Sequence, residues 1–324
     1  MENKDFVIST SARLDRNVKG FPFPNMLTDK RASIIESNVF EAVNAGGEFD
    51  LYPISKTDES DVYALKEKGL ITQALLSSAN SSAIIKRDES ASIMINERDH
   101  VVITAFKSGL DAEGAYAAAD ALDDEISAKV AYAYSDKLGY LTSSPADVGT
   151  GLKVSVTLFL PGLALTNSVD KCAAALSRVG VSLKAVADGD SNGFKYILSS
   201  VRTLGVSEKE ICDKVSRAVE SVKGYEEKAR ASLREGDEAG LKDKILRCYG
   251  IATNCYKATE KEVYTFFAYI KLGAYYGFLS VKDDVNKAEN KLLNYALGKD
   301  KAFSGSTDRD IYRAEKLKEF LKTK

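Results

Sequence analysis

Residues 92–106 read SIMINERDHVVITAF, and this stretch decides how the first half of the chain is expected to fold. Its two apolar ends, 92–96 and 101–106, are short, rich in β-branched residues and partly alternating, which is typical of β-strands. The polar residues 97–100 between them have the composition of a turn. The pattern therefore predicts two strands paired across a tight connection.

Strands and helices are expected on both sides of this hairpin. At 153–160 apolar residues alternate with lysine, serine and threonine, which is the pattern of a strand with one buried face. At 111–134 apolar residues recur at helical spacing and predict a long amphipathic helix. The other expected elements are helices at 32–45, 60–70 and 168–178 and strands at 84–85, 182–187 and 196–203.

Beyond Ser207 the pattern changes, because helical segments follow one another with no convincing strand between them. We place a domain boundary near residues 222–238, although no Pro- or Gly-rich linker marks it. The sequence thus predicts an α+β domain at 1–225 and an all-helical domain at 226–324. The helices expected in this second part are 208–234, 242–256, 259–276, 284–297 and 309–321.

Composition limits the kinds of partner that the protein attracts. Among its 324 residues, 47 are acidic and 45 are basic, so no global positive field draws nucleic acid or an anionic membrane. The cysteines are widely spaced and form no C-x-x-C pair, which favours a reduced setting. The start of the chain lacks a signal-peptide pattern, and no apolar run approaches about 20 residues. We expect a cytoplasmic protein without nucleic-acid or membrane partners.

Four separated stretches resemble the protein arginine kinases, bacterial members of the guanidino-phosphotransferase superfamily. They occur in the family's order and at comparable spacing, and they span nearly the whole chain. The resemblance implies an antiparallel sheet flanked by helices, followed by a helical domain that supports dimerisation and regulation. The four stretches are ISTSARLDRNV at 8–18 with GFPFP after it, SIMINERDH at 92–100, LGYLTSSPADVGTGLKVSV at 138–156 and RDIYRA at 309–314.

The first motif implies a nucleotide site. The family transfers the γ-phosphoryl group of ATP to a guanidinium nitrogen, and it surrounds the phosphates with arginines and Mg²⁺. In its S-x-R-x-R motif both arginines bind phosphate; here Ser9 and Arg13 are kept, and Ser11 replaces the other arginine. The resemblance assigns Ser9 and Arg13 to the nucleotide. The alternative is that Arg13 and Arg16 are surface residues, solvated or paired with acids.

The second motif, N-E-E-D-H-x-R, carries the second Glu that contacts the guanidinium and an Arg that contacts phosphate. In this chain Arg98 takes the place of that Glu, and Val102 replaces the arginine. A cation repels a guanidinium, and losing an orienting group costs about 10²- to 10⁴-fold in rate. Glu97 and Asp99 remain as acidic remnants. We interpret His100, the only histidine, as a hydrogen-bonded turn residue rather than a catalytic group.

The third motif, C-P-T-N-x-G-T-G-L-R-A-S-V, places a reactive Cys before the Pro and an Arg after the glycines. Ser144 stands for the Cys, and serine supplies no thiolate at neutral pH. Lys153 stands for the Arg and loses the planar fork that matches a phosphate. The resemblance assigns Lys153 and Ser155 to the nucleotide. The stretch 149–151 either presents backbone amides to an anion or is only a turn.

A further loop, 184–192, falls where the family has R-G-x-x-G-E-G-S-E, whose last Glu helps to hold the guanidinium. Asn192 takes the place of that Glu, and Asp188 and Asp190 are alternatives because the alignment here is not unique. The chain has thus lost phosphate arginines, the thiol and guanidinium carboxylates. Together these losses predict a pseudokinase with residual binding of ATP and Mg²⁺.

The last motif keeps every defined position. In the family, R-D-x-x-R-A is an allosteric pocket that recognises phosphoarginine, and here it contributes Arg309, Asp310 and Arg313. Arg309 and Arg313 lie four residues apart, which on a helix places them on one face, able to pinch a phosphate, with Asp310 free to meet a guanidinium. The alternative is an ordinary charged surface helix.

Three functions remain in view. The leading hypothesis is a non-catalytic protein that binds phosphoarginine, free or on a protein, or regulates an active arginine kinase or related stress-response proteins as a homo- or heterodimer. The rival is an active protein arginine kinase in which Asp99, Glu97 or Asp188 replaces the missing carboxylates. A purely structural subunit is the third hypothesis, and we assign no metal-binding residues to the chain.

Overall fold

The structure, a computed structural model, describes residues 6–78, 80–186, 193–281, 285–300 and 302–322. At its centre is an eight-stranded sheet with the order β2-β3-β4-β5-β1-β8-β10-β9. Every neighbouring pair runs antiparallel, which confirms the antiparallel sheet implied by the resemblance. The strands are β1 (Val7–Arg16), β2 (Phe49–Pro53), β3 (Ser82–Lys86), β4 (Ala91–Ile95), β5 (Val101–Ser108), β8 (Leu152–Phe159), β9 (Val181–Ala185) and β10 (Lys195–Ser200).

The long helix expected after the hairpin ends early. It is α4 (Ala112–Ser127), and the chain then turns into β6 (Tyr134–Ser135), which pairs with β7 (Gly139–Tyr140) in a separate ribbon. Between α4 and β6, Tyr132 forms an antiparallel bridge with Val18. The pairing of this segment with the chain beyond β1 outweighs its helical periodicity.

Helices cover the two faces of the sheet unequally. One face packs against α1 (Asp29–Val43), α4, α6 (Val169–Ser177) and the first part of α7 (Glu208–Asn254) around the main core. On the other face, α2 (Glu59–Glu67) and α3 (Gln73–Leu76) cover the side of the sheet from β2 to β5. The strip of this second face over β1 and β8 lies beyond α2 and α3.

The helices after Ser207 follow the prediction in part. The break expected between 208–234 and 242–256 is present as a kink in α7, where two helices meet at the non-helical residue Asp237 (φ −156°, ψ 76°). The Asp237 carboxylate accepts from Gly240 N at 2.8 Å and so caps the part of the helix beyond the kink. The segment expected as one helix at 284–297 is two. The remaining helices are α5 (Pro161–Leu165), α8 (Glu260–Tyr275), α9 (Val285–Lys291), α10 (Asn294–Asp300) and α11 (Ser306–Lys322), with 3-10 turns at Pro24–Met26 and Ile54–Lys56.

A buried ion pair fastens α7 to the sheet region. Glu226 accepts from Gly162 N at 2.7 Å and from Leu163 N at 2.8 Å in the first turn of α5, and Arg230 donates to it at 2.6 Å. These bonds compensate for the burial of both charges. The expected boundary at 225/226 thus lies within a continuous, packed helix, and the division into domains stays a prediction.

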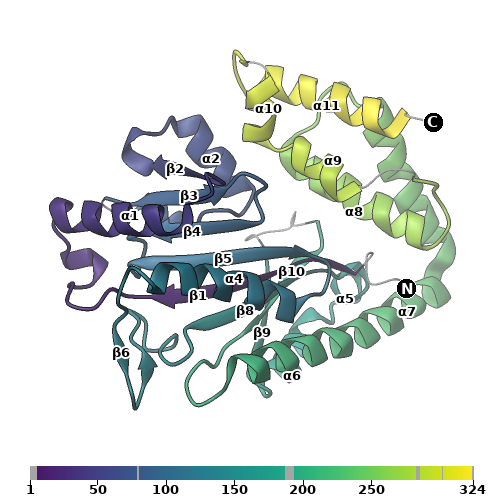
Figure 1. Cartoon of the computed structure of the whole chain (residues 1–324). Coiled ribbons are helices and arrows are strands. Elements are labelled where there is room, and N and C mark those ends of the chain that lie inside the picture. The colour runs from purple at the N-terminus through teal and green to yellow at the C-terminus, as the bar shows by residue number, and fades with distance from the viewer. Residues whose placement is uncertain (1–5, 79, 187–192, 282–284, 301, 323–324) are drawn as a thin grey trace.

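The helical region also meets the sheet region at α2 (Figure 1). Glu67 accepts from Tyr295 N at 2.9 Å and from Ala296 N at 3.2 Å, in the first turn of α10, and Tyr63 stacks on Tyr295 with ring centroids 4.9 Å apart. Burial raises the pKa of Glu67 despite these hydrogen bonds. The two parts of the chain therefore touch where α10 meets α2.

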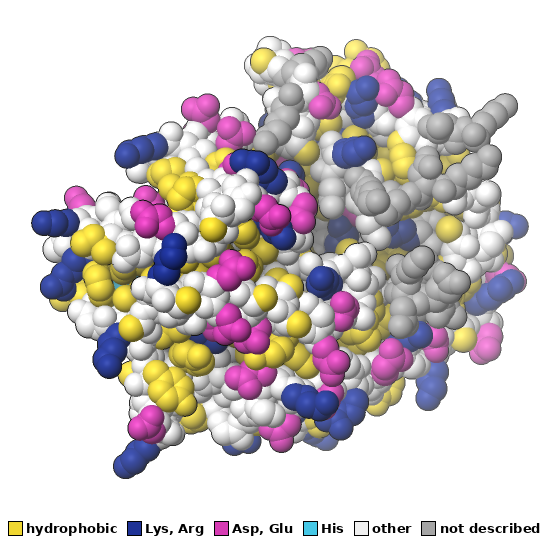
Figure 2. All heavy atoms as spheres, in the orientation of Figure 1, with side chains coloured by type: hydrophobic (Ala, Val, Ile, Leu, Met, Phe, Trp, Pro, Cys, Tyr) yellow, Lys and Arg dark blue, Asp and Glu magenta, His cyan; other side chains and the backbone are white. Residues whose placement is uncertain are grey.

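The charged surface is mixed. Figure 2 shows basic and acidic side chains intermingled over the face in view, in keeping with a net charge of −2. No extended patch of one sign is visible on this face. Within the parts of the chain that the structure describes, no helix is long and apolar enough to cross a membrane.

Candidate active site on the sheet face over β1 and β8

The residues assigned to the nucleotide meet on one face of two adjacent strands. In the register of β1 with β8, Arg13 lies opposite Lys153 and Ser11 opposite Ser155, and Ser9 shares their face of β1. This follows from the strand period, because side chains two residues apart point to the same side. The structure therefore brings Ser9, Arg13, Lys153 and Ser155 together.

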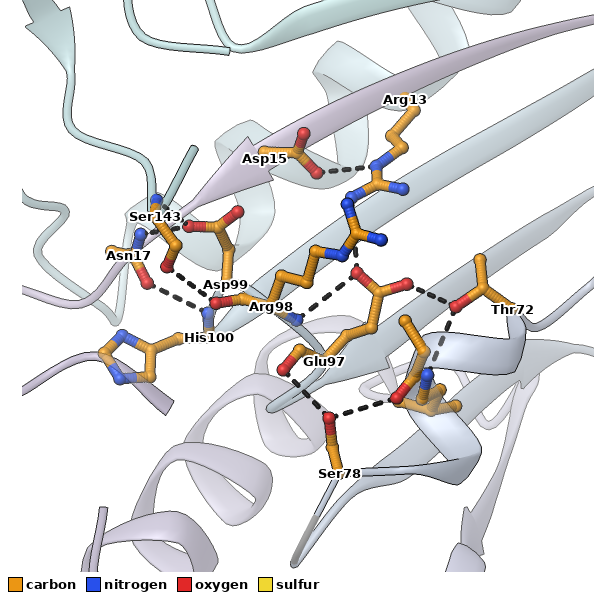
Figure 3. A network of polar contacts seen from close by, with 12 residues as sticks. Arg13, Asp15, Asn17, Thr72, Ser78, Glu97, Arg98, Asp99, His100 and Ser143 are labelled. Atoms are coloured by element: carbon orange, nitrogen blue, oxygen red, sulfur yellow. Dashed lines mark hydrogen bonds and ion pairs between the residues drawn. The ribbon is translucent and has the colours of Figure 1, made fainter. Parts of the chain in front are cut away.

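Arg13 is paired with two carboxylates (Figure 3). Its Nε donates to Asp15 Oδ1 at 2.7 Å, and its Nη2 donates to Glu97 Oε2 at 3.3 Å. Burial by itself lowers the pKa of Arg13, but the attraction of these acids outweighs it and the pKa is raised. The Arg13 side chain is 26% exposed, whereas those of Asp15 and Glu97 are 3% and 1% exposed. Arg13 is thus the accessible member of an otherwise buried network.

Asp15 is a site residue that the motif comparison passes over. Burial, together with the nearby carboxylates of Asp99 and Asp147, raises the pKa of Asp15 to about 6 against the opposing attraction of Arg13. A strand at 7–16, which was not among the predicted strands, is the signal that would have placed Asp15 beside Arg13. The pair spans only two residues, so the strand period alone determines that they share a face.

Glu97 is held by the turn between β4 and β5. Asn96 before it has a left-handed backbone (φ 56°), which asparagine tolerates better than most residues. The Glu97 carboxylate accepts from the Thr72 hydroxyl and from Arg98 N, the latter at 3.3 Å, and Ser78 Oγ donates to Glu97 O at 3.1 Å. Thr72 belongs to a distant part of the sequence, and no local pattern points to this contact.

Asp99 connects three of the motifs. Its Oδ1 accepts from Asn17 Nδ2 and from Ser143 N, the latter at 2.6 Å. Asn17 Oδ1 in turn accepts from His100 N at 3.0 Å, and Ser143 Oγ donates to Arg98 O at 2.6 Å. Asp99 is 2% exposed. Its carboxylate therefore joins the end of β1, the turn and the loop before β8, and it is engaged with protein groups.

His100 has the local hydrogen-bonding role that we expected of it. Val18 N donates to Nδ1 at 3.0 Å, so the proton of the neutral ring is on Nε2, which donates to Pro22 O at 2.8 Å. Burial lowers the pKa of His100. The neutral imidazole thus links the turn to the segment after β1 through hydrogen bonds.

The substituted family positions differ in their surroundings. Arg98 is exposed, and Figure 3 shows its side chain extending from the turn toward the guanidinium of Arg13. Ser144 is half-buried in the loop before β8, where its carbonyl accepts from Thr142 Oγ1 at 2.7 Å. Outside the described residues lie Asn192 and its two alternatives, Asp188 and Asp190.

The glycine-containing stretch before β8 is a packed turn. The amides of Gly149 and Thr150 donate to Tyr140 O and Thr203 O, each at 3.3 Å. Gly149 has φ 119°, and a Cβ there would lie 2.5 Å from Thr203 O. Both amides are therefore engaged by protein carbonyls, which favours the turn over the anion-binding alternative.

Arg16 is paired with an acid, but it is not a surface residue. Its side chain is 3% exposed and donates to Asp123 Oδ2 at 3.0 and 2.8 Å and to Thr150 O at 3.0 Å. Its guanidinium carbon lies 3.6 Å from the centroid of the Tyr140 ring. A Cβ on Gly151 would approach Arg16 Nη1 to 2.7 Å. Arg16 thus holds β1 against α4, and the alternative that Arg16 is a surface residue is wrong.

The phosphoarginine motif also differs from its expected geometry. Arg313 is 0% exposed, and its guanidinium donates to Leu292 O at 2.8 Å, to Ala258 O at 2.9 Å, and to the side chains of Asp310 and Asn294. Although Arg309 and Arg313 are four residues apart, Arg313 does not face solvent beside Arg309. The start of α8 and the α9–α10 segment pack over the side of α11 that carries Arg313. Arg313 points into the helical core.

The comparisons with known proteins agree with these motifs. Residues 31–229 match the family model described as ATP:guanido phosphotransferase, C-terminal catalytic domain. The chain is 33% identical over 300 residues to the protein-arginine kinase of Clostridium acetobutylicum, covering 90% of this chain and 88% of the relative. It is 32% identical over 327 residues to the protein-arginine kinase of Caldanaerobacter subterraneus subsp. tengcongensis, covering 97% and 96%.

Solved structures share the fold. The duplicated taurocyamine kinase from Schistosoma mansoni with bound transition state analog components superposes with a TM-score of 0.62 at 23% identity, covering 79% of this chain and 39% of that one. Lombricine kinase superposes with a TM-score of 0.60 at 21% identity, covering 73% and 69%. At such identities the likeness is one of fold.

Proposed function

We propose that this chain, which belongs to the ATP:guanido phosphotransferase family, is a protein-arginine-kinase-like protein whose catalytic site is impaired and which binds phosphoarginine. The observation that carries the proposal is the ion-pair network around Arg13. The guanidinium that a phosphate would need is held by Asp15 and Glu97. The cation Arg98 stands where the family has its guanidinium-binding carboxylate.

The acidic remnants are poorly suited to hold a substrate guanidinium. Glu97 and Asp99 are both buried, and each already accepts hydrogen bonds from neighbouring protein groups. Arg98 adds an exposed positive charge beside them. Removing one orienting group costs about 10²- to 10⁴-fold in rate. These features support the loss of most transfer activity.

A nucleotide polyphosphate also fits the sheet face poorly. Ser9, Lys153 and Ser155 can donate to phosphate oxygens, but the charge of Arg13 is compensated by two carboxylates. Phosphoryl transfer requires several cations and Mg²⁺ to converge on the phosphates. Among the residues that the structure describes, no three His, Cys, Asp or Glu side chains gather into a metal site. We expect residual, weak binding of ATP with Mg²⁺, and we assign no transfer step.

The phosphoarginine site is proposed at the start of α11. Arg309 is half-buried, and its Nε is a buried donor without a hydrogen-bond partner among the described residues, so a phosphate would reach it once the side chain reorients. Asp310 is 17% exposed and supplies a carboxylate for a guanidinium. Arg313 would then act as a positioning residue, since it binds Asp310 from within the core.

A regulatory role toward an active arginine kinase completes the proposal. The helical region would form the contact, in a homo- or heterodimer, within the cytoplasm. The likeness to protein-arginine kinases over nearly the full chain supports an interaction with that pathway. Co-purification of the tagged chain with an arginine kinase from its own cells tests this part, and an isolated monomer that captures no kinase would refute it.

Calorimetry tests the ligand. Phosphoarginine is titrated into the wild type, into Arg309→Ala and into Lys316→Ala, a control cation on the same helix whose side chain is 37% exposed. Binding that is lost in Arg309→Ala and kept in Lys316→Ala is the expected result. Equal binding of arginine and phosphoarginine, or binding that survives in Arg309→Ala, would contradict the proposal.

The second candidate is an active protein arginine kinase with an altered site. It is favoured by the names of the relatives and by the cross-strand pair of Arg13 and Lys153. Transfer of labelled phosphate from ATP to arginine or to a protein, abolished by Arg13→Ala and unaffected by Arg247→Ala, would establish it. Arg247 is a suitable control because it is a distant cation with a side chain that is 76% exposed.

A further inference from the structure

We propose that Asp15 is the residue that decides whether the cross-strand pair of Arg13 and Lys153 accepts a phosphate group. Its carboxylate occupies the hydrogen-bond donors of Arg13 that a phosphate would use, and so prevents Arg13 from binding an external oxyanion. Without the negative charge of Asp15, the same pair binds the phosphoryl oxygens of a pyrophosphate or polyphosphate. This inference rests on the proposed function only in placing the phosphate subsite at Arg13 and Lys153.

The geometry of the guanidinium fork is the first argument. Arg13 directs Nε to Asp15 at 2.7 Å and Nη2 to Glu97 at 3.3 Å. These two nitrogens form one edge of the planar fork, which is an edge that would otherwise bind two phosphate oxygens at once. An entering phosphate therefore has to compete with carboxylates for the donors of that edge.

Burial makes Asp15 a persistent competitor. Its side chain is 3% exposed, and its backbone is fixed in β1 by pairing with Val102 on one side and by donation from Asp15 N to Gly151 O at 3.0 Å on the other. A surface acid would exchange its arginine for water at little cost. Asp15 has no such route, because separating a buried carboxylate from its cation leaves the charge uncompensated.

The charges around this point decide which ligands are admitted. The carboxylates acting on Arg13 or Asp15 are those of Asp15, Glu97, Asp99 and Asp147. The cations are Arg13 itself, Lys153 across the strand and Arg98 at the turn; among the described residues Lys153 forms no ion pair. With Asp15 ionised the acids oppose a polyanion. Removing one charge at Asp15 shifts this balance toward phosphate.

The same groups predict how proton concentration acts on the site. Asp15 is surrounded by Arg13 on its own strand, by Asp99 from the turn after β4 and by Asp147 from the loop before β8. Burial and the two acids raise the pKa of Asp15 to about 6, with Arg13 opposing them. Protonation of Asp15 below that pH therefore removes its negative charge in the wild type, as an Asp15→Asn substitution does at any pH.

Pyrophosphate binding to the full chain tests the inference. Calorimetry compares the wild type, Asp15→Asn and Asp50→Asn, a control that removes an exposed carboxylate of β2. At pH 7.5 we expect Asp15→Asn to bind pyrophosphate about 10-fold or more tightly than the wild type, the usual effect of a like charge at this range. At pH 5 this ratio should fall toward one, and Asp50→Asn should match the wild type at both values.

A second variant keeps the result interpretable. Asp15→Asn combined with Arg13→Gln should lose the gain, while circular dichroism verifies that each variant is folded. Equal affinities of wild type and Asp15→Asn at pH 7.5, or a gain that survives without Arg13, would overturn the inference. Phosphate transfer by the wild type would instead overturn the proposed loss of catalysis. If Asp15→Asn leaves pyrophosphate affinity unchanged, the proposed loss of catalysis is still supported by Arg98.

Discussion

Arg13 on the sheet and Arg313 in the helical region are both motif arginines paired with an aspartate, yet their surroundings differ. Arg13 is 26% exposed, and it pairs with the carboxylates of Asp15 and Glu97. Arg313 is 0% exposed, and it also serves two main-chain carbonyls and an amide oxygen. Arg13 is a partly accessible cation held by ion pairs, whereas Arg313 is a buried residue of the helical core. A preserved motif therefore does not by itself identify an accessible binding group.

The largest effect is expected where the packed arginine is removed. Arg313→Ala leaves Asp310 without its buried partner and uncaps the carbonyls of Ala258 and Leu292. Breaking a buried pair in this way costs about 3–5 kcal/mol of unfolding free energy. Urea denaturation followed by circular dichroism measures it, with Arg309→Ala as the matched control. Equal stability of the two variants would erase the distinction between Arg313 and an ordinary surface arginine.

The next effect concerns the acid that holds Arg13, and it has the opposite sign. Because Asp15 has a folded-state pKa of about 6, above its unfolded value, the folded protein keeps the proton longer and stability falls as pH rises from about 4 to 6. Asp15→Asn removes that loss, which amounts to about 3 kcal/mol above pH 6.

Guanidinium denaturation at pH 4 and at pH 8 checks this expectation. The variant should be more stable than the wild type at pH 8 and equal to it at pH 4, while Asp50→Asn should follow the wild type throughout. A variant that is less stable at pH 8 would mean that the attraction between Asp15 and Arg13 exceeds the cost of burying the carboxylate.

A smaller loss of stability is expected when a hydrogen bond to the buried carboxylate of Glu97 is removed, and it should exceed the loss from removing a hydrogen bond to a neutral carbonyl. Thr72 donates to Glu97 and accepts from Leu75 N at 3.2 Å, so Thr72→Val removes a hydrogen bond to a charged group together with a helix cap. We expect a loss of about 1.5–3 kcal/mol. Thr57→Val, which removes only a bond to Pro53 O at 2.8 Å, is the control and should cost about 1 kcal/mol. Equal losses in thermal unfolding would count against a charged network at Glu97.

The smallest effect is expected at the exposed cation. Arg98→Ala removes no buried group, so its unfolding free energy should stay within about 0.5 kcal/mol of the wild type. Differential scanning calorimetry measures the shift. A clear destabilisation would show that Arg98 is a member of the buried network and not a solvent-facing cation beside it.

Much of the fold could be predicted from local patterns. The strands around the turn at 97–100 and the alternating strand at 153–160 are present, since alternation of apolar residues is itself the cause of a one-sided strand. β1 was not predicted, because the polar residues between Ser9 and Arg16 are not typical of a central strand. The split between α9 and α10 also has no local signal, because it depends on contacts with α2 and α11.

The candidate site was predictable in part. The sequence by itself determined which side chains sit at each motif position, including Arg98 and Lys153, and which of them strand periodicity places on one face. Only the tertiary structure decided that Asp15 and Glu97, the latter 84 residues away, close on Arg13, and that Arg313 is enclosed by segments from three helices. The physical reason is that desolvation and long-range pairing are properties of packing, whereas spacing along the chain fixes only direction and charge.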